Sequence, residues 1–485
     1  MASLNTNIDL SAEIVGHNTI VPVIDGRVRY VNLDNAASTP PLRAVQQAVD
    51  RFATWYASVH RGSGYKNRVS THAYEAARIA VAEFVGIDPA RQTVIFVKHT
   101  TEGLNRVAHS LTPDTIVFTS IMEHHAAMLP WRERGLEVQY IAADADGVID
   151  RQHLEALLRA APGGRPKLVA IAGAYNVSGC TPPIHELARL AHQHRARILI
   201  DGAQLVPHQP VCVRGTCTDD ALDYLVFSGH KLYAPYGSGV LIAPNDVLLG
   251  APAMVGGGTV DLVTLDEVQW ADLPDREEAG SPNVMGVVAL HAAIQRLQQL
   301  GMPSVAAHER ALTEYALARL AELPGVRVLG PATACDRLGT ITFTVGNVPP
   351  FLVAAILACE WGVAVRAGCF CAHPAMMHLL DLSATERAAL QARVRAHDKL
   401  DIPGGVRASL ALYNTRADVD ALIGGLQAIL AGGWQGTYRA DPSSGEYEPV
   451  GWSPRLDAAF SVAGPGPDIL LETVLQMPAV MGMPA

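Results

Sequence analysis

Between about residues 92 and 242, short apolar runs alternate with amphipathic stretches. The apolar runs are bounded by turn-forming residues, which is typical of buried β-strands. They cover residues 93–97, 115–119, 137–142, 167–173, 197–201, 224–228 and 239–243. Amphipathic stretches such as 183–196 lie between several of these runs and predict helices. Strands that alternate with helices predict a largely parallel sheet with both faces covered, in which ligands bind at the carboxyl ends of the strands.

After residue 282 the pattern becomes rich in helices and predicts a smaller α+β domain. Helices are expected over 283–301, 304–323 and 350–362, strands over 340–345, 363–367 and 405–413, and a last helix near Ala417–Ala431. Thr415 is placed to cap that last helix, with Asp418 in its first turn. The expected division is an N-terminal extension (1–30), a large domain whose first segment completes the small domain (31–282), a linking helix with the small domain (283–431), and an irregular C-terminal extension (432–485).

Composition narrows the class of protein. Of the 485 residues, 49% are hydrophobic and 17% are charged, which is typical of a soluble globular enzyme. The formal net charge is −10 and no basic stripe occurs, so no nucleic-acid partner is expected. Seven cysteines without a repeating spacing fit a reducing cytoplasm better than a disulfide framework. Neither a secretory signal nor a charge-free apolar stretch of about 18 residues is present, so no membrane span is expected.

Lys231 stands in an unusual setting. It follows Ser-Gly-His at the end of a predicted strand, within FSGHKLYAPYGSGVL. A lysine in a partly dry site has a depressed pKa and can form a Schiff base with an aldehyde, although most lysines are solvated surface residues. Asp201 ends another predicted buried strand, and Gln204 follows one turn later. A carboxylate there can pair with the pyridinium nitrogen of pyridoxal phosphate, and the alternative is a helix N-cap.

Two further stretches carry candidate ligand-binding groups. In KHTTEGLN, Thr100 and Thr101 lie at a predicted strand-to-helix junction, where N–H groups and hydroxyls can hold a phosphate or simply cap the helix. In MEHHAAMLPW, His124 and His125 are adjacent. Because no matching Cys, His or Asp cluster completes a metal site, we expect no metal and favour an imidazole stacked on a cofactor ring.

Taken in order, these stretches resemble the class V aminotransferase superfamily of fold-type I pyridoxal phosphate enzymes, and within it the cysteine desulfurase/selenocysteine lyase group. The resemblance covers roughly residues 31–430. The matching stretches are VNLDNAASTP, VHRG, TTEGLN, MEHHAAMLPW, YNVSGCTPPI, DGAQLVPH, FSGHKLYAPYGSGVL, EAGSPN and RASLALYNT. The resemblance implies an α/β fold with a mostly parallel seven-stranded sheet in the large domain and a smaller α+β C-terminal domain.

The resemblance also implies a role for each matching residue. Lys231 would carry pyridoxal 5'-phosphate as a Schiff base. The cofactor ring would be stacked by His124 and bonded by Asp201 at the pyridine nitrogen and by Gln204 at the phenolic oxygen. The phosphate would be held by Thr100, Thr101, Ser228 and His230. Ser281 matches the position that reaches the phosphate of a neighbouring subunit, which implies a homodimer with shared active sites.

The implied substrate groups lie in the C-terminal half. Arg407 matches the arginine that grips the substrate carboxylate, assisted by Asn176, and a guanidinium fork suits a carboxylate. In the family, a mobile loop after Arg-Ala-Gly carries the cysteine that attacks the substrate sulfur, and this position falls on Cys371. Lys231 would then remove the α-proton, and the Cys371 thiolate would take the sulfur as a persulfide. Arg366, a further substrate-binding candidate, His230 or His373 would favour the thiolate.

The sequence departs from the family pattern in two places. Relatives usually carry two histidines where Cys369 and Phe370 stand, and Gly-Cys-Phe-Cys is closer to the loop of molybdenum-cofactor sulfurases. Cys369 is expected to pack as a small apolar residue; sulfur relay and a reversible disulfide with Cys371 are the alternatives. Residues 65–68 are expected to form a solvated loop; alternatively, Lys66 or Arg68 enters the site and binds an extra anionic group of a specialised substrate.

The preferred interpretation is a cytoplasmic, homodimeric cysteine desulfurase. It would convert L-cysteine, or a related amino acid, to L-alanine and pass sulfur through Cys371 to an acceptor protein. The alternative is another class V enzyme, such as a C–S lyase, an epimerase or a transaminase, because a fold does not fix a reaction. Lys231 and Asp201 would be shared by all of these. Cys371 is the discriminating residue, since the alternatives do not need a thiol on this loop.

Overall fold

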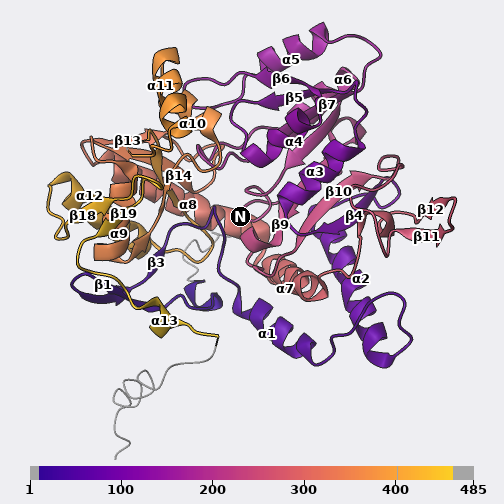
Figure 1. Ribbon diagram of the computed structural model, residues 1–485, viewed down its shortest axis with the longest axis horizontal. Coiled ribbons are helices and arrows are strands. Elements are labelled where there is room, and N and C mark those ends of the chain that lie inside the picture. Colours follow the sequence, from indigo (N-terminus) through magenta and orange to yellow (C-terminus); the bar gives the residue numbers. More distant parts are fainter. Residues whose placement is uncertain (1–9, 401, 463–485) are drawn as a thin grey trace, which may run out of the picture.

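The computed structural model describes residues 10–400 and 402–462. Its centre is a seven-stranded sheet with the order β4-β10-β9-β8-β7-β5-β6 (Figure 1). The strands are β4 (Gln92–Val97), β5 (Ile116–Ser120), β6 (Glu137–Ile141), β7 (Lys167–Ala172), β8 (Arg197–Asp201), β9 (Tyr224–Ser228) and β10 (Gly239–Pro244). The strands from β9 to β6 are parallel, and β10 runs against both of its neighbours. The predicted mostly parallel sheet is confirmed.

Helices cover both faces of this sheet. Side chains alternate along each strand, so in β4 Val94 and Phe96 join one apolar core, whereas Ile95 and Val97 join the other. The first core includes residues of α1 (Arg43–Ala53), α2 (Tyr65–Val85), α5 (Arg151–Ala160), α6 (Ile184–Gln193) and α7 (Val284–Leu300), and the second includes residues of α3 (Thr100–Ser110) and α4 (Leu129–Glu133). Burial on both faces explains why the strands read as continuous apolar runs.

The small domain is built on a four-stranded antiparallel sheet with the order β13-β14-β17-β16. Its strands are β13 (Val326–Leu329), β14 (Thr340–Val345), β16 (Arg366–Gly368) and β17 (Gly405–Ser409), and its core is completed by α8 (Met302–Ala321), α9 (Pro350–Trp361) and α12 (Arg416–Leu430). The single strand predicted over 363–367 is two strands. The first, β15 (Val363–Ala364), pairs with β3 (Val31–Asn32), and β16 pairs with β17, so the N-terminal segment joins the small domain.

Between β16 and β17 the chain forms the cysteine loop (residues 369–372), then α10 (His373–Leu379) and α11 (Ala384–Arg395). A separate apolar cluster connects this loop to the large domain, because Phe370 and Met376 pack with Met122 and Tyr175. The loop is therefore held against the carboxyl ends of β5 and β7, where a parallel sheet binds its ligands.

Two hairpins near the ends of the described chain pack on α9 of the small domain. At the start, β1 (Ile20–Val23) and β2 (Gly26–Arg29) form a hairpin. Near the end, β18 (Tyr438–Ala440) and β19 (Tyr447–Pro449) form another, and α13 (Leu456–Ala459) follows. Glu360 anchors this second hairpin, since its carboxylate accepts hydrogen bonds from the N–H groups of Gln435 and Gly436 and from the Tyr438 hydroxyl. The segment thus differs from the irregular extension predicted there.

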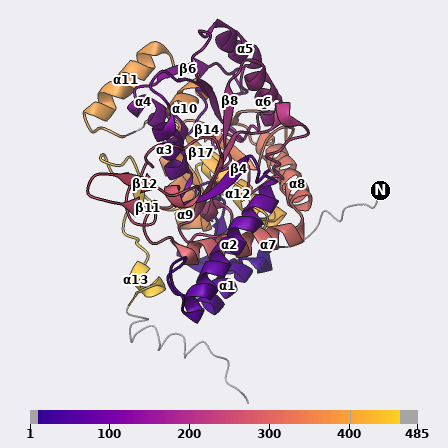
Figure 2. The ribbon, with the colours of Figure 1, turned by 90° about the vertical axis from the view of Figure 1, so that its right-hand side faces the viewer.

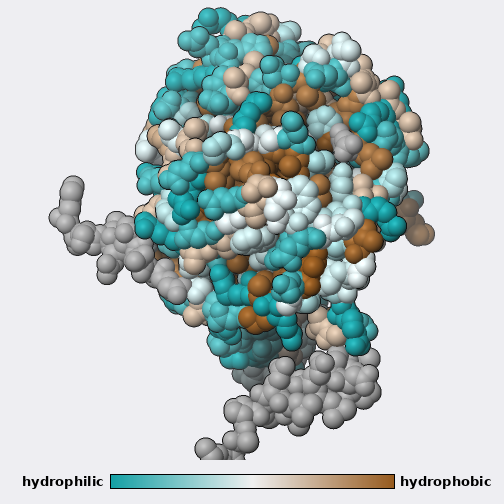
Figure 3. Space-filling view, turned by 90° about the vertical axis from the view of Figure 1, so that its left-hand side faces the viewer, coloured by the Kyte–Doolittle hydropathy of each residue, from teal (hydrophilic) through white to brown (hydrophobic). Residues whose placement is uncertain are grey.

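Two surface features complete the fold. A hairpin of β11 (Val260–Val263) and β12 (Val268–Trp270) projects from the large domain, at the right of Figure 1 and the left of Figure 2. On the face shown in Figure 3, apolar residues show between polar ones across the middle of the molecule. None of the helices in the described ranges is long and apolar enough to cross a membrane.

Candidate functional site

Lys231 ends a short helical turn, Gly229–Lys231, that follows β9. Thr39 holds this turn, because its backbone N–H donates to the carbonyl of His230 at 2.9 Å. Burial lowers the pKa of the Lys231 amine to about 8; the Asp201 carboxylate opposes this shift and the Arg407 cation adds to it. An amine with this pKa is partly neutral near pH 7 and is therefore able to act as a nucleophile or a base.

Asp201, Gln204 and His124 surround the same region. Asp201 ends β8 with 6% of its surface exposed, and its Oδ1 accepts a hydrogen bond from the Ala203 N–H at 2.9 Å. The Gln204 Nε2 donates to the Ala36 carbonyl at 2.8 Å, while its buried Oε1 has no partner among the described residues. Burial, and then the Lys231 cation, lower the pKa of His124 to about 4, so the imidazole is neutral. A neutral flat ring suits stacking on an aromatic ligand.

Hydroxyl groups converge where α3 begins. The Thr100 N–H donates to the Ser228 Oγ at 2.8 Å, and the two hydroxyls lie 2.7 Å apart. Thr101 is exposed in the same first turn. Burial, and then Lys231, lower the pKa of His230 to about 4. Hydroxyls and N–H groups at the N-terminus of a helix form a suitable anion site, and a phosphate fits it.

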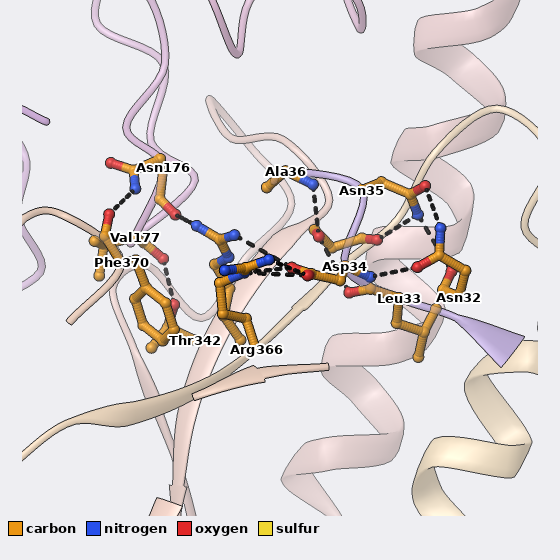
Figure 4. Close-up of polar contacts among 12 residues, drawn as sticks. Asn32, Leu33, Asp34, Asn35, Ala36, Asn176, Val177, Thr342, Arg366 and Phe370 are labelled. Carbon is orange, nitrogen blue, oxygen red and sulfur yellow. Dashed lines mark hydrogen bonds and ion pairs between the residues drawn. The ribbon is translucent and has the colours of Figure 1, made fainter. Parts of the chain in front are cut away.

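Two arginines meet at one carboxylate, Asp34 (Figure 4). Arg366, on β16, has its Nη2 2.7 Å from Oδ2 and its Nε 3.1 Å from both oxygens. Arg407, on β17, is 2% exposed, and its Nη2 lies 3.4 Å from Oδ1. Burial lowers the pKa of Arg407 to about 10, and Asp34 opposes this shift. The buried Nε of Arg407 has no partner in the described ranges, so this guanidinium keeps a donor for an incoming carboxylate.

Asn176 connects the arginine to the cysteine loop. Its backbone carbonyl accepts a hydrogen bond from the Arg407 Nη1 at 3.1 Å. Its side-chain Nδ2 donates to the Phe370 carbonyl at 2.8 Å, and the Phe370 ring lies under the Arg407 guanidinium at 4.8 Å. The Asn176 amide is therefore engaged with the loop, whereas the resemblance implied that it assists the substrate carboxylate.

The two cysteines of the loop occupy different environments. Cys371 is exposed, and a negative charge on its thiol would stabilise the nearby cations of Lys231 and Arg366, which places the thiol within electrostatic reach of both. Cys369 is half-buried, with its Sγ 3.5 Å from the Pro403 carbonyl. Burial, and then Cys371, raise the pKa of the Cys369 thiol to about 11. Cys369 is therefore a protonated, packed thiol, and all seven cysteines are free.

The remaining candidates lie apart from this centre. Ser281 is exposed just before α7. The loop predicted over 65–68 is wrong, because these residues form the first turn of α2, whose apolar residues Tyr74 and Val81 pack on the sheet. Lys66 and Arg68 are exposed there. Among the described residues, no group of three or more His, Cys, Asp or Glu side chains could hold a metal ion.

Sequence reasoning gave no role to Asp34 or to His125. Asp34 lies in the matching stretch VNLDNAASTP, where a carboxylate among apolar residues was a usable signal. His125 donates its backbone N–H to the Cys371 carbonyl at 2.7 Å. The ion pairs of Asp34 and the hydrogen bond of His125 cannot be predicted from the local sequence pattern, because the partners are more than 200 residues apart in the chain.

The groups present fit pyridoxal phosphate. Its phosphate would lie at the hydroxyls of Thr100 and Ser228, and its aldehyde would meet the Lys231 amine. The unpartnered Gln204 Oε1 is an orphaned buried polar atom facing this region, as a polar ligand requires. A buried carboxylate at Asp201 would be matched by a protonated pyridine nitrogen.

We expect Asp34→Asn to lower the free energy of unfolding by about 3 kcal/mol, because it leaves the buried Arg407 cation without its carboxylate. Arg366→Gln removes the other, largely exposed partner of Asp34 and should cost less than about 1 kcal/mol. Urea unfolding of both variants provides the comparison. Equal losses would show that Asp34 does not compensate the charge of Arg407.

Comparison with known proteins points to the same family as the sequence motifs. The family described as aminotransferase class V matches residues 31–422. A cysteine desulfurase of Haloferax volcanii is 36% identical, with 83% of this chain and 90% of the relative covered, and one of Dickeya dadantii is 37% identical, with 82% and 91% covered. Among solved structures, an apo cysteine desulfurase of Thermococcus onnurineus superposes with a TM-score of 0.73 at 30% identity, covering 83% of this chain and 95% of the other. A cysteine desulfurase of Escherichia coli gives 0.69 at 30%, with the same coverage.

Proposed function

Because this chain belongs to the class V aminotransferase family, we propose that it is a pyridoxal phosphate-dependent cysteine desulfurase, which converts L-cysteine to L-alanine and receives the sulfur on Cys371. The position of the exposed Cys371 thiol, within electrostatic reach of Lys231, carries this proposal. A lyase, an epimerase or a transaminase of the family would need Lys231 and Asp201, but it would not need this thiol.

The cofactor sites are part of the proposal. When bound, pyridoxal phosphate supplies an electron sink that stabilises negative charge at the substrate α-carbon. Lys231 would hold it covalently, Asp201 would keep its pyridine nitrogen protonated, and His124 would stack on its ring. The depressed pKa of Lys231, about 8, supports the first of these roles, because a neutral amine is required for attachment.

Each step of the proposed reaction is carried out by particular residues of this chain. Arg407 binds the substrate carboxylate through its remaining donors, and Arg366 adds positive charge nearby. Lys231 takes the α-proton. The Cys371 thiolate bonds to the substrate sulfur while the carbon–sulfur bond breaks, and the electron pair of that bond goes to the β-carbon. Protonation of that carbon gives the methyl group, Lys231 returns a proton to the α-carbon to complete alanine, and Cys371 is left as a persulfide.

The capture of pyridoxal phosphate by the apoprotein should follow the titration of Lys231. With a pKa of about 8, the neutral fraction of the amine rises from about a tenth at pH 7 to about nine-tenths at pH 9. We therefore expect the second-order rate constant to rise about 10-fold over this range and then level off. The growth of visible absorbance measures it, with Nα-acetyl-lysine as the reference for the cofactor's own titration. A rise of nearly 100-fold without a plateau would indicate an ordinary lysine.

Two surface features support a homodimer and a sulfur acceptor. At the β11–β12 hairpin Leu262 is 48% exposed, Val263 is 57% exposed and Leu265 is fully exposed, and apolar surface of this kind favours contact with another chain. A second subunit would also bring the exposed Ser281 to a phosphate. The exposed Cys371 is open to an acceptor thiol, and the free thiols suit a reducing cytoplasm.

Product analysis tests the proposal. The purified holoprotein is incubated with L-cysteine and a thiol reductant, and alanine and sulfide are measured. Equal amounts of alanine and sulfide are expected. Pyruvate and ammonia would instead assign a lyase, and an absence of sulfide would overturn the desulfurase.

A further inference from the structure

The cysteine loop is held in an unfavourable backbone conformation. Phe370 and Cys371 both have positive φ angles, 54° and 55°, a region that residues with a Cβ rarely adopt. Two such residues in succession persist only where the surrounding contacts determine the conformation. The contacts that do so lie on both sides of Cys371. On one side, the Asn176 amide binds the Phe370 carbonyl at 2.8 Å.

On the other side, the loop is held by contacts of His125. The backbone N–H of His125 donates to the Cys371 carbonyl at 2.7 Å. The Nε2 of His125 lies 3.2 Å from the backbone N of His373 and 3.1 Å from the His373 Nδ1. The two imidazole rings are stacked, with centroids 4.9 Å apart and planes 4° from parallel.

The direction of these hydrogen bonds follows from their partners. A backbone N–H can only donate, so the His125 Nε2 must present a lone pair to His373. The His373 Nδ1, which faces the same lone pair, must then carry its proton. The His125 ring is neutral in this arrangement, because its Nε2 holds a lone pair. In agreement, burial lowers the pKa values of both histidines.

We propose that His125 and His373 are positioning residues that clamp the cysteine loop and fix the Cys371 thiol beside Lys231. The inference rests on the proposed desulfurase function and adds to it. His125 directly follows His124, so one short segment would place both the cofactor ring and the attacking thiol. Neither histidine touches the reacting atoms. Their effect on the reaction passes through the backbone of Cys371.

Hydrogen–deuterium exchange of the holoprotein tests the clamp without using activity. In His125→Ala, the amide of His373 loses its acceptor, and we expect at least about a 10-fold faster exchange in peptides that contain residues 370–376. His125→Gln should restore protection, because the amide Oε1 can accept the same hydrogen bond. The matched control is His378→Ala, also on α10, where the Nε2 contacts the Asp144 carbonyl at 2.6 Å, away from the loop. It should leave exchange at residues 370–373 unchanged.

Kinetics provide the second measurement. We expect His125→Ala to lower kcat for alanine formation by about 10-fold with little change in KM, because the thiol is misplaced while substrate binding is intact. In His373→Asn the Nδ2 can donate in place of the histidine Nδ1, so kcat should fall less than in His373→Ala. Unchanged exchange and unchanged kcat in His125→Ala would overturn the clamp, as would equal effects in His378→Ala. If the wild type releases no sulfide from L-cysteine, the proposed function fails, and the exchange data still decide whether the clamp exists.

Discussion

Cys371→Ala is expected to lower sulfide release from L-cysteine at least about 100-fold while the visible absorbance of the bound cofactor stays unchanged. The thiol is exposed and within electrostatic reach of Lys231 and Arg366, which supports its proposed role as the group that meets the substrate sulfur. It takes no part in holding the cofactor. The loss should therefore appear in kcat, measured as sulfide and alanine at saturating L-cysteine.

Cys369→Ala is the matched control for this variant. The two cysteines share a loop, but the Cys369 thiol is half-buried, and its pKa of about 11 keeps it protonated near neutral pH. We expect kcat for sulfide release to fall less than about threefold, because a protonated thiol is a poor nucleophile. If both variants lose activity equally, Cys369 takes part in sulfur transfer, and its assignment as a packing residue is wrong.

Lys231→Ala is expected to reduce alanine formation by roughly 1,000-fold, because the variant loses the proposed base for the α-proton. It also loses the proposed point of covalent attachment of the cofactor, so borohydride reduction should leave no label on the protein. Pyridoxal phosphate can still bind through the groups at Asp201, Thr100 and Ser228. Retention of the cofactor after gel filtration, measured with and without prior reduction, separates these two effects.

Lys167→Ala provides the matched control for the lysine. Lys167 begins β7, at the end of the sheet opposite to the site, so its removal should change neither the absorbance nor the turnover. A holoprotein of Lys231→Ala that still carries a reducible covalent label would place the attachment on another lysine. That result would contradict the site described for this chain.

The large domain could be predicted from the sequence because its strands are buried on both faces and its helices are amphipathic. Both patterns are local, and the seven strands lie where the apolar runs predicted them. The β18–β19 hairpin could not be predicted in this way. It is anchored by Glu360, a residue more than 70 positions earlier, and its own strands are short and half-exposed. The start of α2 was also missed, since its first turn is polar and exposed.

Residues of the candidate site could be predicted where a reactive side chain lies at or just after the end of a buried strand. Lys231, Asp201 and Thr100 follow or end buried strands, and parallel strands bring their carboxyl ends to one edge. Asp34 and Arg407 are 373 residues apart in the chain, so their contact exists only in the folded protein. The same is true of His125 and His373, which are 248 residues apart. Sequence patterns indicate which residues carry chemistry, and tertiary contacts decide how those residues are held.

The proposed function depends on the transfer of sulfur to one particular thiol, that of Cys371. The most direct measurement is mass spectrometry of the holoprotein after a brief incubation with L-cysteine, without reductant and with alkylation of thiols and persulfides. Fragmentation of the tryptic peptide 367–387 separates Cys369 from Cys371. We expect Cys371 to gain the mass of one sulfur atom and Cys369 to gain none. A peptide without added sulfur on Cys371, recovered while alanine accumulates, would contradict the proposed function.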